Sequence, residues 1–293
     1  MKVIVVSGFL GSGKTSFIQS FAKNLDDIAI LENDYAGANV DEDLLRETGR
    51  EILSLEEGCI CCSKKGDFAT SVLTVANTIN PSYLIIEPTG LGFLSKIIEN
   101  IKTIEYENIE LLSPITIVDY YQIDDYLKNY REIFIDQIEN SSYILLSKTE
   151  NISEESINKA IEILKPYTGA KIYKKHYKDF SKDEYKELID KYDYSKIDLS
   201  NFEHFHMESL CYENVSYKDF QQMGTIFNAI CQVRFGKVLR AKGFVKVDDK
   251  TVKIDIVNSK FSLEKYSGEA GKNLIFIGEN LDKRAFDIMF KNK

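Results

Sequence analysis

The segment Gly8–Thr15 constrains the fold more than any other part of the sequence. It reads Gly-Phe-Leu-Gly-Ser-Gly-Lys-Thr, which fits the pattern G-x-x-x-x-G-K-[ST] at every required position. It follows an apolar run at residues 3–6 and opens an amphipathic stretch at residues 14–23. In such a loop, backbone N–H groups and the start of the following helix surround an anion. The segment therefore predicts a strand, a phosphate-binding loop and a helix in succession.

Short apolar runs alternate with helix-length stretches through about the first 175 residues. The runs are bounded by polar residues or glycine, as is typical of strands buried on both faces of a parallel sheet. We expect strands at Val3–Val6, Ile28–Leu31, Ile52–Leu55, Leu84–Ile86, Ile115–Val118, Ile144–Leu146 and Ile172–Tyr173, and helices that include Lys14–Lys23, Phe68–Ile79 and Glu154–Lys165. This pattern predicts an α/β fold, a P-loop NTPase domain with a mostly parallel sheet.

A different pattern begins near Phe202. Half of the residues from 171 to 200 are charged, which predicts a polar helix followed by a linker, with one continuous solvated helix as the alternative. Beyond it we expect a helix at Tyr217–Cys231, strands at Val238–Val247, Val252–Val257 and Leu274–Ile277, and a terminal helix at Leu281–Phe290. Strands that run together with few helices indicate a small α+β domain. The expected organisation is a P-loop domain at 1–180, a charged linker at 181–201 and a C-terminal α+β domain at 202–293.

The composition is that of a globular chain, because 44% of the 293 residues are hydrophobic and 28% are charged. Its longest apolar runs fall far short of the roughly 20 residues that span a bilayer. The N-terminus leads into the glycine loop and does not resemble a signal peptide. The net charge of −9 argues against nucleic acid as a partner. We therefore expect a cytoplasmic protein with neither a membrane nor a nucleic-acid partner.

The residue types in the glycine loop assign roles to its positions. Lys14 would neutralise the β- and γ-phosphates of a nucleoside triphosphate, and the hydroxyl of Thr15 would ligate Mg²⁺. The other nucleotide contacts expected here are Gly8, Gly11, Ser12, Gly13 and Ser16. The alternative is a glycine-rich turn that only caps a helix.

The run Ser147-Lys148-Thr149-Glu150 follows the sixth expected strand, where P-loop GTPases carry an N-K-x-D guanine reader. The carboxylate of Glu150 can accept hydrogen bonds from N1–H and the 2-amino group of guanine, whereas adenine presents an acceptor at N1. The stem of Lys148 can lie along the purine face. Ser147 replaces asparagine, and Glu150 is one methylene longer than aspartate. The run favours guanine, and a polar loop without base contacts is the alternative.

An acidic residue follows two other buried strands. Glu87, after Tyr83–Ile86, would face the phosphates and hold a Mg²⁺-bound or attacking water. Gly90 could bring its N–H to the γ-phosphate. Capping of the next helix is the alternative role of Glu87. Asp119 occupies a similar strand end without a clear role.

Three of the five cysteines, Cys59, Cys61 and Cys62, fall within four positions. Cysteines so close in sequence make poor disulfides, and thiolates are soft ligands that suit Zn²⁺, Cu(I) or Co²⁺. Three sulfurs leave the fourth coordination position of a tetrahedral metal open, or filled by a ligand from elsewhere. A carrier that must release its metal needs such a position. A packed cysteine turn and a redox thiol pair are the alternatives. Cys211 and Cys231 stand alone on apolar segments and are expected in the core.

With these motifs in this order, the chain resembles the CobW-like GTPases, a P-loop family of metal-handling proteins related to the urease and hydrogenase nickel-insertion GTPases. The resemblance covers nearly the whole chain, and its most specific element is the Gly-Cys-Ile-Cys-Cys run at 58–62. It rests on Ser7–Thr15, Glu32-Asn33-Asp34, Gly58–Cys62, Glu87–Gly90, Asp136-Gln137-Ile138, Ser147–Glu150 and Gly236–Gly243. The chain departs from many relatives at Gly37, where they carry an acid, and it lacks their histidine-rich tract.

The resemblance implies a GTPase of low intrinsic turnover that binds a transition metal and delivers it to a client metalloprotein. It makes Cys59, Cys61 and Cys62 the metal thiolates and places Glu32 and Asp34 where they touch the metal or Mg²⁺. The implied cofactors are GTP, Mg²⁺ and Zn²⁺, with Co²⁺ or Ni²⁺ as other metals, and a homodimer is allowed for. Two other functions stay open: a small-molecule kinase or transferase, and a nucleotide-binding thiol redox switch.

Overall fold

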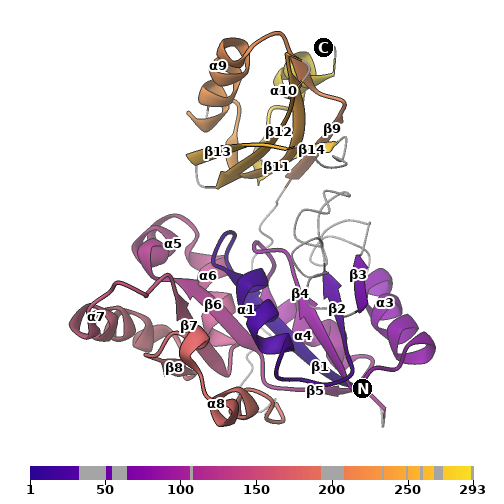
Figure 1. Ribbon diagram of the computed structural model, residues 1–293, viewed down its shortest axis with the longest axis vertical. Helices are drawn as coiled ribbons and strands as arrows, with labels where there is room; N and C mark the ends of the chain where they lie inside the picture. Colours follow the sequence, from indigo (N-terminus) through magenta and orange to yellow (C-terminus); the bar gives the residue numbers. More distant parts are fainter. Residues whose placement is uncertain are drawn as a thin grey trace. The chain divides into compact units, whose positions relative to one another are not determined.

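The computed structural model describes residues 1–32, 51–54, 65–105, 108–192, 208–232, 234–248, 250–257, 260–266 and 273–291. These residues form two compact units, residues 1–192 and residues 208–291 (Figure 1). Among the described helices, none combines the length and the hydrophobicity that crossing a membrane would require.

A parallel sheet forms the centre of the first unit, which confirms the predicted α/β class (Figure 1). Its strand order in the described residues is β3-β2-β4-β1-β6-β7-β8, and β5 also pairs with β1. The strands are β1 (Lys2–Gly8), β2 (Ile28–Glu32), β3 (Glu51–Ser54), β4 (Tyr83–Glu87), β5 (Glu110–Leu111), β6 (Ile115–Asp119), β7 (Tyr143–Ser147) and β8 (Lys171–Tyr173). The helices are α1 (Lys14–Ala22), α3 (Lys65–Thr78), α4 (Leu94–Lys102), α5 (Ile123–Asn129), α6 (Arg131–Glu139), α7 (Glu154–Leu164) and α8 (Lys182–Glu187), with 3₁₀ turns η1 (Tyr120–Gln122), η2 (Lys165–Tyr167) and η3 (Tyr177–Asp179).

Helices cover both faces of this sheet. Successive strand residues point to opposite sides, so each strand packs against helices on both faces. In β1, Ile4 and Val6 join an apolar cluster that contains α1, whereas Val3 and Val5 join one that contains α3 and α4. All four side chains are fully buried. Burial on both faces is the reason why these strands read as continuous apolar runs in the sequence.

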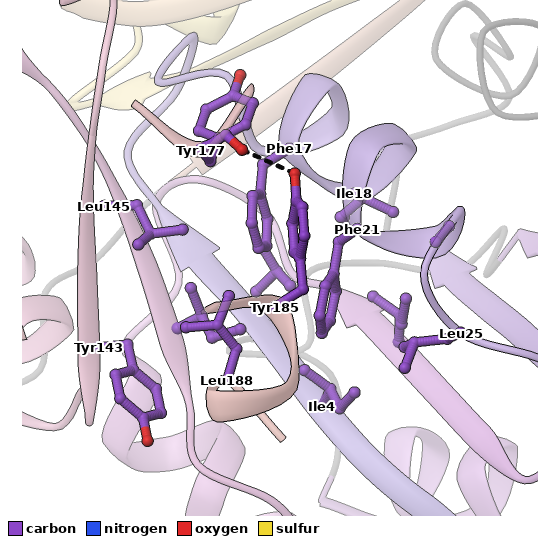
Figure 2. Packing of buried hydrophobic residues seen from close by; sticks show 14 of the residues in the cluster. Ile4, Phe17, Ile18, Phe21, Leu25, Tyr143, Leu145, Tyr177, Tyr185 and Leu188 are labelled. Carbon is purple, nitrogen blue, oxygen red and sulfur yellow. Dashed lines mark hydrogen bonds between the residues drawn. The ribbon is translucent and has the colours of Figure 1, made fainter. Parts of the chain in front are cut away.

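An aromatic layer joins α1 to the chain that follows β8 (Figure 2). Phe17 and Phe21 stack with ring centroids 5.3 Å apart. Phe17 meets Tyr177 edge-on at 5.3 Å, and Phe21 stacks on Tyr185 at 6.0 Å. The hydroxyl of Tyr185 donates to the backbone oxygen of Tyr177 at 2.8 Å, the dashed line in Figure 2. The helix that begins at the phosphate loop is therefore fixed by residues from the end of the unit.

Residues 181–192, which we predicted to lie in a linker, contribute to the core of the first unit. The side chain of Ser181 accepts from the N–H of Glu184, and the Glu184 carboxylate accepts from the N–H of Ser181 at 2.7 Å, so α8 begins with a capping box. Leu188 and Tyr192 are buried. The prediction of a linker rested on the high fraction of charged residues in this segment, and that fraction does not show which positions are apolar and buried.

The second unit has the α+β character that we predicted. Its sheet order is β13-β12-β11-β14-β9 with antiparallel neighbours, and β10 pairs parallel to β11. The strands are β9 (Glu208–Glu213), β10 (Ser216–Tyr217), β11 (Lys237–Val247), β12 (Lys250–Val257), β13 (Lys260–Lys265) and β14 (Asn273–Glu279), and the helices are α9 (Phe220–Cys231) and α10 (Lys283–Phe290). An apolar core that includes Phe227, Phe276 and Phe286 joins the two helices to this sheet.

The prediction that Cys211 lies in the core is wrong, because its side chain is exposed. In the pairing of β9 with β14, Tyr212 lies opposite Leu274, and both belong to the core. Cys211 is the residue before Tyr212 in β9, so it points to the opposite face of the sheet. Cys231, at the end of α9, is half-buried.

Candidate nucleotide-binding site

Five neighbouring strands bring polar or glycine residues to one edge of the parallel sheet. β1, β2, β4, β6 and β7 end at Gly8, Glu32, Glu87, Asp119 and Ser147. Glu32 lies in register with Glu87, and Asp119 lies in register with Ser147. The carboxyl ends of strands in an open α/β sheet are where such folds bind ligands. Gly8, Glu87 and Ser147, which we predicted for the nucleotide site, therefore lie at the edge where a ligand is expected.

The glycine loop has a backbone that requires glycine. Gly8, Gly11 and Gly13 have φ values of 140°, 70° and 95°, in the region that other residues rarely adopt. A Cβ at Gly8 would lie 2.3 Å from the backbone oxygen of Ile117 on β6, a steric clash. The loop thus lies directly against the neighbouring strand, and Gly13 leads into the first turn of α1.

Lys14 and Thr15 meet Glu87 at the start of α1. The ammonium group of Lys14 is buried and donates to the backbone oxygens of Gly8 and Phe9 at 3.2 and 3.4 Å. It lies 4.0 Å from Oε1 of Glu87. The hydroxyl of Thr15 donates to the same carboxylate, 3.1 Å from each oxygen. A hydroxyl, a carboxylate and an ammonium group thus converge beside the loop, and these are groups that a Mg²⁺-nucleotide site uses.

Two buried hydroxyls strengthen the case for an anion here. Neither Ser7 Oγ nor Ser12 Oγ has a hydrogen-bond partner among the described residues. A buried hydroxyl without a partner is unfavourable, and the hydroxyl of Ser12 could donate a hydrogen bond to a phosphate oxygen. The oxygen atoms of Thr15 and Glu87 are hard ligands of the kind that Mg²⁺ prefers. The donor set therefore fits both a phosphate group and its metal.

The end of β7 is tied to the phosphate loop and to β6. Ser147, at the position where the N-K-x-D pattern has asparagine, donates its hydroxyl to the backbone oxygen of Ser12 at 2.6 Å. Lys148 has a left-handed φ of 59°, and its ammonium group lies 2.6 Å from Oδ2 of the buried Asp119. This ion pair gives Asp119 a role that the sequence left open: it fixes the lysine of the expected base-binding run.

Glu150 lies beside two basic side chains from the loop after β8. Its Oε1 is 3.6 Å from Nε2 of His176 and 3.7 Å from Nζ of Lys178. A hydrogen bond from its own backbone N–H lowers the pKa of Glu150, and His176 and Lys178 lower it further. Burial lowers the pKa of His176, whose Nδ1 accepts from the N–H of Lys178. Glu150 is therefore an ionised acceptor, half exposed, at the end of the run.

Asp136 is a buried acid that the sequence flagged only through the family resemblance. Its Oδ2 accepts from the N–H of Ser95 at 3.2 Å in the first turn of α4, where Phe93 provides no side-chain cap. Burial raises the pKa of Asp136 to about 6, although its hydrogen bonds with Ser95 and Leu94 oppose the shift. Loss of hydration outweighs those hydrogen bonds, so ionising this residue destabilises the fold.

We expect Asp136→Asn to remove a pH dependence of stability. Between pH 4 and 6 the folded state binds more protons at Asp136 than the unfolded state does, so stability falls as pH rises through this window. The free energy of unfolding of the wild type, minus that of the variant, should fall by about 2 kcal/mol from pH 4 to pH 7. Urea denaturation at a series of pH values measures this difference. Asp183→Asn, at an exposed position, is the control, and parallel curves for wild type and Asp136→Asn would contradict the prediction.

The predicted metal residues are described only in part. Glu32 is buried at the end of β2, whereas Asp34, Cys59, Cys61 and Cys62 lie outside the described residues. Within the described ranges, no group of three histidine, cysteine or acidic side chains is placed to hold a metal ion. The cysteine assignment therefore stays a prediction.

The strand order, the glycine loop and the acid at the end of β4 define a P-loop nucleotide-binding protein. The family model for the CobW/HypB/UreG nucleotide-binding domain matches residues 2–173, and that for the cobalamin synthesis protein CobW C-terminal domain matches residues 207–292. The chain belongs to the CobW/HypB/UreG family.

Several characterised proteins are similar to this chain. "Zinc chaperone YeiR" of Escherichia coli strain K12 is 30% identical over 156 residues, which are 52% of this chain and 48% of that protein. "Zinc-regulated GTPase metalloprotein activator 1" of Dictyostelium discoideum is 30% identical over 206 residues, with coverage of 55% and 42%. The chain thus spans about half the length of these curated relatives. The crystal structure of Zn(II)-bound YjiA GTPase from E. coli aligns with 99% of this chain and 97% of that one, at 18% identity and a TM-score of 0.46.

Proposed function

We propose that this protein is a GTP-hydrolysing metallochaperone that binds zinc through Cys59, Cys61 and Cys62 and delivers it to a client metalloprotein. The observation that carries the nucleotide half is the convergence of Lys14, Thr15 and Glu87 beside a glycine loop. The metal half is supported by the cysteine run and by the names of the relatives, which are zinc chaperones and a zinc-regulated GTPase.

In the proposed hydrolysis, the chain's own residues hold and orient the triphosphate. Lys14 would leave its two carbonyl partners for the β- and γ-phosphates, and Thr15 and Glu87 would hold Mg²⁺, which neutralises charge that develops on the phosphate oxygens. Glu87 would also orient the attacking water, and the N–H of Gly90 would contact the γ-phosphate. Gly8, Gly11, Ser12, Gly13 and Ser16 would contribute the remaining phosphate contacts. We expect slow turnover in the isolated protein, because the sequence shows no obvious arginine finger in the segment from Glu32 to Gly66, which the metal and the nucleotide would share.

Guanine would be read by the run at the end of β7. Glu150 would accept from N1–H and the 2-amino group, and Lys148, held by Asp119, would lie against the purine face. Ser147 would keep this run in a fixed position relative to the phosphate loop through its bond to Ser12. The longer side chain of Glu150 is accommodated at a position where half of it is exposed.

The residues proposed to bind the metal lie between the phosphate loop and Glu87 in the sequence. Glu32 and Asp34 would contribute oxygen ligands for zinc or Mg²⁺. Thiolates also admit Co²⁺ or Ni²⁺, so the metal in the cell would depend on availability and on the client. Binding of GTP and binding of metal would each shift the affinity for the other, and this coupling must be reciprocal. We propose a cytoplasmic location, with the client metalloprotein as partner and a homodimer as a further assembly to test.

Anaerobic zinc titration against a competing chelator, with and without GTP and Mg²⁺, tests the proposal. A tight site whose affinity changes at least several-fold with GTP is the expected result. A zinc affinity that is the same with and without GTP would indicate a structural site. The absence of tight zinc binding by the reduced protein would overturn the zinc assignment.

We expect Cys61→Ala to separate the two halves of this function. The variant should lose tight zinc binding, because two thiolates leave the coordination shell incomplete, while its GTP affinity stays within about twofold of wild type. Zinc and GTP titrations of the same preparation measure both quantities, and Cys231→Ala, at a half-buried position outside the run, is the matched control. Loss of GTP binding together with zinc would instead show that the cysteines are structural.

A further inference from the structure

We propose that Gln137 positions the loop after β4 against the phosphate loop, and thereby sets how well the site distinguishes GTP from GDP. This inference rests on the proposed GTPase function. We call residues 88–93 the Gly90 loop. The side-chain Nε2 of Gln137, on α6, donates to the backbone oxygens of Gly90 and Gly92 at 3.2 and 3.0 Å. One buried amide therefore holds two carbonyl groups of the loop that carries Gly90.

Gln137 is itself held rigidly. Its side chain is fully buried, and its backbone oxygen accepts from the Thr116 hydroxyl on β6 at 3.0 Å and from the Ser141 hydroxyl at 2.5 Å. Thr116 is the second residue of β6, three residues before the Asp119 that binds Lys148. These two bonds fix the backbone from which the side chain extends, and burial restricts the side chain itself, so Gln137 can determine the position of a loop.

The preceding residue holds the far end of the same loop. Asp136 accepts from the N–H of Ser95 in the first turn of α4, and its other oxygen accepts from Nδ2 of Asn140 at 3.1 Å. Two consecutive residues of α6 therefore bind the Gly90 loop and the start of the helix that follows it. The loop cannot move far without breaking contacts to α6.

The same helix region also supports the phosphate loop. Phe9 packs against Tyr126 and Tyr130, with ring centroids 4.4 and 5.0 Å away, and Tyr130 is the residue before α6. Gly90 lies so close to this loop that a Cβ on it would come within 2.5 Å of the backbone nitrogen of Leu10. α6 and its N-terminal flank thus hold both loops, and the γ-phosphate is expected to bind next to their contact. GTP has that phosphate and GDP lacks it, so the position of Gly90 affects the two nucleotides differently.

The amide of Gln137 also has an unused acceptor. Its Oε1 is buried and accepts no hydrogen bond from any described residue. Both donated bonds go to the Gly90 loop, so the carboxamide interacts with that loop as a donor only. A purely structural buried amide would be expected to satisfy its oxygen as well.

Gln137→Met tests the inference, because methionine keeps the length of the side chain and removes both donated bonds. We expect its affinity for a non-hydrolysable GTP analogue with Mg²⁺ to fall about tenfold, and kcat for GTP to fall at least about as much. Affinity for GDP should stay within about twofold. Gln137→Leu, which also removes both donated bonds without adding a charge, is the second variant and should show the same selective loss. Isothermal titration with both nucleotides and steady-state hydrolysis measure these changes.

Ile138→Val is the matched control, since Ile138 is buried on the same helix and its side chain makes no hydrogen bond. It should lower the melting temperature and leave the ratio of GTP to GDP affinity unchanged. Equal losses for both nucleotides in the Gln137 variants, or a lower melting temperature alone, would overturn the positioning role and leave the proposed GTPase intact. Wild-type protein that binds neither nucleotide would instead overturn the proposed function, and this inference with it.

Discussion

Replacement of Lys14 by alanine is expected to reduce GTP affinity about 100-fold and kcat/KM for GTP by about 1000-fold. The ammonium group of Lys14 is buried beside the backbone of the glycine loop, where it can exchange its two carbonyl partners for phosphate oxygens. Charge-assisted hydrogen bonds to phosphate are among the strongest in proteins, and alanine removes them together with the positive charge. Isothermal titration with GTP and Mg²⁺ measures the affinity, and steady-state phosphate release measures the rate.

Lys23→Ala provides the control for the loss of one charge. Lys23 caps the other end of the same helix and is exposed to solvent. Its replacement should change the nucleotide affinity by less than about twofold, because exposed charges at this distance are screened by salt. A Lys14→Ala protein that folds and binds GTP as tightly as wild type would exclude the glycine loop as the phosphate site.

Glu150→Gln is expected to change which base the site accepts. Guanine offers two donors to a carboxylate, and a carboxamide can satisfy only one of them, so GTP affinity should fall about 100-fold. Xanthine has an oxygen in place of the 2-amino group, and the amide of glutamine can donate to it. The variant should therefore prefer XTP over GTP, the reverse of the wild type.

Competition of XTP and GTP for a fluorescent nucleotide measures this change in both proteins. Glu155→Gln, at an exposed position on α7 where the native carboxylate pairs with Lys159, is the matched control and should keep the preference for GTP. His176 and Lys178 stay in place in the variant, so the electrostatic field around the base changes by one charge only. An unchanged order of affinities in Glu150→Gln would show that Glu150 does not contact the base.

The parts of the site that follow from local sequence were predictable. The residues from Gly8 to Thr15 are consecutive, and their strand, turn and helix are set by glycine positions and by hydrophobic runs on either side. Glu87 and Asp119 were found because a parallel sheet brings its carboxyl ends to one edge. Their partners were harder to assign, since nothing in the sequence alone shows that Lys148 reaches back to Asp119.

The parts that depend on contacts between distant segments were not predictable. Gln137 lies 45 residues from Gly92, and the resemblance that singled out Asp136-Gln137-Ile138 gave no role to this glutamine until the fold placed it beside a loop. The orientation of Cys211 was decided by the register of β9 on β14, and a one-residue shift of that register would have buried it. The end of the first unit was misplaced because Leu188 and Tyr192 stand among charged residues.

The contact of Phe9 with Tyr126 and Tyr130 bears on how strongly the loop can hold an anion. A glycine-rich segment loses more conformational entropy than most when it becomes ordered. Here that loss occurs when the protein folds, since the aromatic packing fixes the loop without any ligand. Little of the attraction between the loop and a phosphate is then offset by ordering of the backbone. A loop of the same sequence without the rings of Tyr126 and Tyr130 beside it would bind the same anion more weakly, although every atom that touches the phosphate would be unchanged.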